Sequence, residues 1–151
     1  MQLDGLRQWR TAPRTWEYAF LRYATLVYAF GLLVHTADHL RRGIGVLTPE
    51  VFWAGNVSTV AGVAVIIVVL TGHRLAAPVA AAFGFPVAVG IALVHLLPHW
   101  SALSDAFPGA HHTGVTSMSW GVVLIEIVGA IALSVAGLVA VRRASEDAAA
   151  R

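Results

Sequence analysis

The chain has 151 residues, of which 58% are hydrophobic and 12% are charged, and its formal net charge is +2. This composition excludes an ordinary soluble domain, because a chain of this length cannot bury so much apolar surface, and it indicates an integral membrane protein. The absence of cysteine excludes disulfides and thiolate metal sites, and the arginines that flank the apolar runs are typical of membrane orientation signals and do not suggest a nucleic-acid partner.

Four apolar segments follow one another along the chain. Each is close to the length that a helix needs to cross a bilayer, and none shows the alternation of a membrane β-strand. The expected spans are residues 16–36, 52–71, 75–97 and 115–141. The sequence therefore predicts an all-α polytopic membrane protein, a four-transmembrane-helix bundle over residues 16–141, with a cytoplasmic N-terminal segment (1–15) and a cytoplasmic tail (142–151).

The first span ends in the sequence LLVHTADHLRR, which contains His35, Asp38 and His39. Residues four apart lie on one face of a helix, about 6 Å apart along its axis. The two imidazoles should therefore project together, with the carboxylate of Asp38 beside them.

The third span ends in a related sequence, ALVHLLPHW, which contains His95 and His99. These two side chains share a face only if Pro98 does no more than kink the last turn, since the residue before a proline is disfavoured in helical geometry. Earlier in the same span, Pro86 predicts a kink.

The two histidine pairs are sixty residues apart and suggest an internal repeat. Residues 23–40 align with residues 83–100, including the shared Leu-Val-His and the histidine four positions later. Two direct helix-hairpin repeats would be related by an axis along the membrane normal. This symmetry would place both pairs at the same depth, facing a common centre.

The arginines predict the orientation of the bundle. Eight of them fall on one side of a four-span protein, and only Arg41 and Arg42 fall on the other. The positive-inside rule then predicts a multi-pass protein of the cell membrane with both termini in the cytoplasm. Six of the seven histidines lie at or beyond the outer ends of the spans, and only His73 is expected inside.

Such a concentration of imidazoles favours a metal site at the extracytoplasmic face. Imidazole binds Fe, Zn or Cu, and carboxylates can complete or orient the coordination sphere. The predicted metal ligands are His35, His39, His95, His99 and Asp38, with His111, His112 and Asp105 as additional candidates. A single haem b held by His35 and His95 across the bundle is an alternative cofactor.

Glu126 is the one acidic residue expected deep inside a span, about 16 Å from its outer end. It is predicted to be a proton relay or an outer partner of the metal site, or else a protonated acid bound to a neighbouring helix. Three functions stay open: a metal-dependent oxidoreductase or hydrolase acting on a lipid-soluble substrate, a haem-binding electron carrier, and a non-catalytic subunit or proton or ion transporter. A homodimer or a place in a larger membrane complex is compatible with each.

Overall fold

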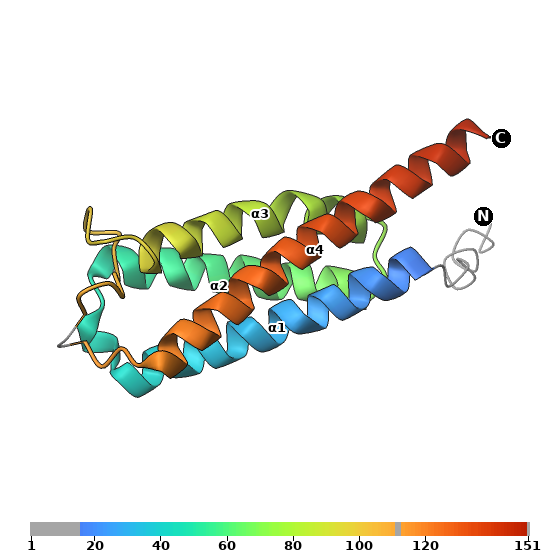
Figure 1. The fold of residues 1–151 in the computed structure, drawn as a ribbon. Helices are drawn as coiled ribbons and strands as arrows, with labels where there is room; N and C mark the ends of the chain where they lie inside the picture. The colour runs from blue at the N-terminus through green and yellow to red at the C-terminus, as the bar shows by residue number, and fades with distance from the viewer. Residues whose placement is uncertain (1–15, 111–112, 151) are drawn as a thin grey trace.

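The computed structural model describes residues 16–110 and 113–150, and this part of the chain is helical with no strand. The long helices are α1 (Trp16–Arg42), α2 (Pro49–Leu70), α3 (Ala76–His95) and α4 (Ser117–Ala149), with a short 3-10 helix, η3 (Ile44–Val46), before α2. They form an up-down-up-down bundle in which the start of α1 and the end of α4 lie at the same end (Figure 1). All four long helices are long and apolar enough to cross a membrane.

Helix α4 packs closely on α1 because glycines occur at the crossing. A Cβ atom on Gly31 would lie 2.6 Å from the Cα of Glu126, and one on Gly129 would lie 2.8 Å from the Cα of Tyr28. Small residues are what allow the backbones of membrane helices to approach each other in this way. The contact brings the backbone of Glu126 against α1, one turn before His35.

Helices α3 and α4 make a second close contact, around Pro86. A Cβ on Gly84 or Gly137 would clash with the backbone of the facing helix. Ser134 of α4 inserts its hydroxyl into α3, where it accepts a hydrogen bond from the Phe85 N–H (2.8 Å) and donates one to the Ala81 carbonyl (2.9 Å). The hydroxyl thus satisfies backbone groups in the turn that a proline disturbs.

Several helix ends differ from the predicted spans. Helix α1 continues to Arg42, six residues past the predicted end, because its buried stripe continues through polar side chains rather than stopping with the apolar run. Helix α3 ends at His95, before Pro98. Helix α4 continues to Ala149 through the expected tail, where Arg143 lies near Glu146 and Asp147 at helical spacing.

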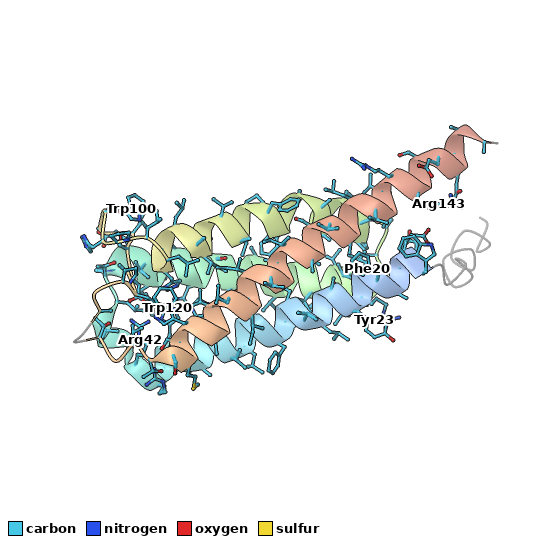
Figure 2. The ribbon with its side chains drawn as sticks, viewed as in Figure 1. Phe20, Tyr23, Arg42, Trp100, Trp120 and Arg143 are labelled. Carbon is cyan, nitrogen blue, oxygen red and sulfur yellow. The ribbon has the colours of Figure 1, made fainter. Side chains whose placement is uncertain are left out.

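The segment between α3 and α4 folds back onto the end of α3. Backbone N–H groups of Asp105 and Phe107 donate to the carbonyls of Val94 and His95 at 3.0 and 2.9 Å. The Trp100 indole N–H donates to the Leu93 carbonyl at 2.9 Å. These bonds satisfy carbonyls that a helix end leaves unpaired, and they hold Asp105 close to His95. Trp100, Trp120 and Arg42 lie toward this end of the bundle, with Phe20, Tyr23 and Arg143 toward the other (Figure 2).

Candidate metal centre

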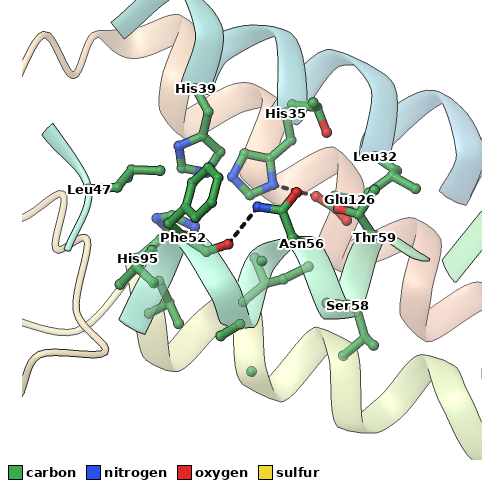
Figure 3. A pocket seen from close by; sticks show the side chains of 18 of the residues that line it. Leu32, His35, His39, Leu47, Phe52, Asn56, Ser58, Thr59, His95 and Glu126 are labelled. Atoms are coloured by element: carbon green, nitrogen blue, oxygen red, sulfur yellow. Dashed lines mark hydrogen bonds and ion pairs between the residues drawn. The ribbon is translucent and has the colours of Figure 1, made fainter. Parts of the chain in front are cut away.

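Three histidines from two helices meet at one end of the bundle. His35 and His39 lie on successive turns of α1, and His95 is the last residue of α3. One ring nitrogen from each lies within 4.8 Å of the others, and the three side chains face one another in Figure 3. His35 and His95 are buried and His39 is partly buried. A buried group of imidazoles is the donor set that Zn, Fe or Cu prefers.

His35 is held by Glu126, which reaches it from α4. The His35 Nδ1 and the Glu126 Oε2 form a hydrogen bond between two buried side chains. The other ring nitrogen, His35 Nε2, is also buried and has no hydrogen-bond partner among the described residues. When the Nδ1–H donates to the carboxylate, Nε2 carries the lone pair and faces the cluster, which is the tautomer that a metal ligand requires.

His95 and His39 share a second carboxylate, that of Asp105. The His95 Nδ1 lies 3.2 Å from the backbone oxygen of Asp105 and 3.4 Å from its Oδ2, while the His39 Nδ1 lies 3.8 Å from that Oδ2. Nδ1 of His95 is therefore engaged, and its Nε2 is the atom left for a metal. The His39 Nδ1 is buried without a hydrogen-bond partner in the described part of the chain.

Arg42 fixes Asp105 from the end of α1. Its guanidinium donates to both carboxylate oxygens, at 2.6 and 2.7 Å, and to the Thr113 carbonyl at 3.0 Å. Burial alone would raise the pKa of Asp105, but the hydrogen bonds from His95 and Arg42, with the charge of Arg42, hold that pKa well below its usual range. The Arg42 guanidinium also lies 5.3 Å above the ring of Phe107, which in turn packs on His95.

The remaining predicted ligands lie elsewhere. His99 is exposed and follows the end of α3, so it does not share a helix face with His95 and is not part of the cluster. Asp38 is buried, but it pairs with Arg41 (Nε to Oδ1, 2.9 Å) and is not among the clustered ligand atoms. His111 and His112 lie outside the described residues.

The sequence interpretation missed Arg42 and Phe107 as parts of this site. The arginine count uses Arg42 only as an orientation signal, although its spacing from His35 and Asp38 marks it as part of the buried stripe. His35, Asp38 and Arg42 are spaced by three and four residues and continue the buried stripe that includes Tyr28 and Gly31. Phe107 lies in an irregular segment, where no periodicity marks a buried residue.

A cavity of about 510 Å³ adjoins the cluster and is lined by residues of α1, η3, α2, α3 and by Glu126. Its wall is mostly apolar, and Phe52, Leu47 and Leu32 are among the lining residues labelled in Figure 3. Its polar residues are the three clustered histidines and Glu126, together with Thr36, Asn56, Ser58 and Thr59. A largely apolar pocket with a small group of convergent polar side chains is typical of a small-molecule site.

The arrangement thus combines three imidazoles, the residues Glu126 and Asp105 that hold His35 and His95, and an adjoining cavity. Three protein ligands beside open space leave a coordination position for a water molecule or a substrate, as in catalytic metal sites. Comparisons of this chain with protein-family models, with curated proteins and with solved structures found no match.

Proposed function

We propose that the chain is an integral membrane protein that binds one transition-metal ion through His35, His39 and His95, close to one face of the bilayer. The observation that carries this proposal is the approach of three ring nitrogens to within 4.8 Å at one end of a largely apolar bundle. Burying unpaired polar groups in such a place is costly, and His35 Nε2 and His39 Nδ1 have no hydrogen-bond partner among the described residues. A bound cation would give both nitrogens a partner.

Zn²⁺ and Fe²⁺ fit this donor set best, since thiolates are absent and the ligands are neutral imidazoles. Zn–N bonds of about 2.0–2.1 Å would bring the three ring nitrogens together around the ion. The metal would polarise an oxygen ligand or activate a bound water in its open position. The protein would then act as a metal-dependent enzyme or redox protein on a lipid-soluble substrate, with Glu126 placed to accept a proton.

A single haem b held by His35 and His95 is less compatible with the same geometry. The two ring centroids are 4.9 Å apart and the rings meet edge to face. Axial imidazoles on one haem need the iron and the porphyrin plane between them. The two rings would have to separate before a haem could enter.

Metal analysis and a visible spectrum of the purified protein test the proposal. We expect stoichiometric Zn or Fe without the Soret band of a haem. Because ligands of one ion act as a unit, His35→Ala and His95→Ala should each remove most of the metal, and the double variant should be hardly worse than either. His39→Ala should have the same effect.

Two exposed histidines provide matched controls. His99 lies near the same end of the bundle and His73 lies at the other, and both should be replaceable by alanine without loss of metal. A Soret band would show that the protein binds haem, and would contradict the proposed metal-ion site. Absence of both metal and haem, or full occupancy in the single variants at positions 35 and 95, would contradict the proposal and favour a non-catalytic subunit or transporter.

A further inference from the structure

The cavity beside the histidines is long and runs into the apolar part of the bundle. On α3 its wall extends from Ala82 to His95, which is about 20 Å at 1.5 Å per residue. The histidines and Glu126 lie toward the His95 end of this length, and the deeper wall includes Leu32 and Phe83. On α2 the wall also includes the polar residues Asn56, Ser58 and Thr59. A ligand that fills the cavity therefore has a polar group at one end and an extended, mostly apolar body.

The exposed part of the cavity wall contains apolar side chains as well as the polar Thr36 and Asn56. Leu40 and Ile44 both line it, and they are 67% and 58% exposed. If the helices lie in a bilayer, these side chains are in contact with lipid near its surface. The ligand can then enter from the membrane without passing through water.

The charges around the histidines specify the polar group further. A divalent ion on three neutral imidazoles adds two positive charges, which the carboxylates of Glu126 and Asp105 would balance. Arg42, however, donates hydrogen bonds to both oxygens of Asp105, and its guanidinium adds one positive charge to the site. Asp38 and Arg41 cancel each other. The loaded site keeps a surplus of one positive charge in a region where unbalanced charge is costly, so a ligand with one negative charge is favoured.

We infer that the site binds a single-chain carboxylate, a fatty-acid-like molecule whose anionic oxygen occupies the open metal position and whose chain lies in the cavity. This inference rests on the proposed metal centre and names the class of molecule that the centre takes. The carboxylate balances the surplus positive charge, and the chain buries its methylene groups against the apolar part of the wall.

The test uses the full chain in a non-ionic detergent, loaded with Co²⁺ as a spectroscopic substitute for Zn²⁺. Dodecanoate should change the Co²⁺ spectrum at a concentration at least about ten-fold lower than acetate, a difference that the burial of two methylene groups already provides. Methyl dodecanoate, which has the chain without the charge, should leave the spectrum unchanged.

Two glycines allow the chain site to be tested separately from the metal. Gly90 lines the cavity and Gly121 does not, and a Cβ atom on either would meet nothing within 4 Å. Gly90→Leu should therefore fill the cavity and weaken dodecanoate binding by about ten-fold or more, with Co²⁺ and acetate binding preserved. Gly121→Leu, the matched control, should behave as the unaltered protein.

The outcomes separate this inference from the metal proposal. Co²⁺ binding is measured before any amphiphile is added, and its absence would overturn both. A protein that binds Co²⁺ but responds equally to dodecanoate and acetate, or to neither, would overturn the fatty-acid inference alone. So would a Gly90→Leu variant that still binds dodecanoate as tightly as the Gly121→Leu control.

Discussion

At the scale of single residues, the site depends on the groups behind the histidines as much as on the histidines themselves. His35 is fixed by Glu126, and His95 by Asp105, which Arg42 holds in turn. These partners come from three different elements. The orientations of the His35 and His95 rings therefore depend on tertiary contacts. A ligand whose second nitrogen is engaged in this way has a defined tautomer and a restricted ring, which raises its affinity for a metal.

Glu126→Gln tests the importance of this support. The amide oxygen can still accept a hydrogen bond from His35, so the protein should fold. The lost charge should weaken metal binding by about 10–100-fold, the range seen when such outer partners of metal ligands are replaced. Metal titration of the purified variant gives the measurement, and Glu146→Gln, at an exposed position of the same helix, is the control. Unchanged affinity in a well-folded variant would assign Glu126 a structural role.

At the scale of elements, α4 is the helix that organises the bundle. It approaches α1 through Gly31 and Gly129 and approaches α3 through Gly84 and Gly137. Its buried residues extend from Ser119 to Ala140, along most of its length. Because α1 and α3 both pack on α4, their histidine-bearing ends are fixed relative to each other. The cavity lies where α1, α2 and α3 do not close against one another.

Ser134 is the polar contact of α4 with α3, and Ser134→Ala tests it. The variant would leave the Phe85 N–H without its acceptor beside Pro86, at an expected cost of about 1–3 kcal/mol. The free energy of unfolding in detergent measures this loss. Ser145→Ala is the matched control, because that exposed hydroxyl donates to the Val141 carbonyl of its own helix. Equal stability of the two variants would mean that the Phe85 N–H finds another acceptor.

At the scale of the whole molecule, the histidine cluster lies at the opposite end of the bundle from most of the arginines expected to mark the cytoplasmic side. Arg74 and Arg143 lie toward the end away from the cluster, whereas Arg41 and Arg42 lie beside it and bind Asp38 and Asp105. The two arginines at the cluster end thus have a structural reason to be there. This strengthens the expectation that the cluster faces the outside of the cell.

Reporter fusions test this orientation. A reporter active only in the periplasm should work when fused after Ala106 and fail when fused after Arg151, because of the eight-to-two arginine distribution. A fusion after Gly72, between α2 and α3, should fail as well. The opposite pattern would place the metal centre at the cytoplasmic face.

The sequence by itself determined the helical class and the number of long apolar helices. These follow from local properties, the length and continuity of each apolar run, and the structure confirms four helices that are long and apolar enough to cross a membrane. The sequence also identified His35, His39 and His95 as candidate ligands. A spacing of four residues and the end of an apolar run can both be read directly from the order of the residues. The sixty-residue repeat stays a prediction.

The tertiary structure decided which candidates meet. His99 lies outside the cluster because α3 ends at His95, before Pro98, and helical spacing has no meaning beyond a helix end. Arg42 and Asp105 are 63 residues apart in the chain, and only the folding of the α3–α4 segment onto α3 brings them together. Such contacts depend on backbone hydrogen bonds and packing between distant segments, which leave no periodic trace in the sequence.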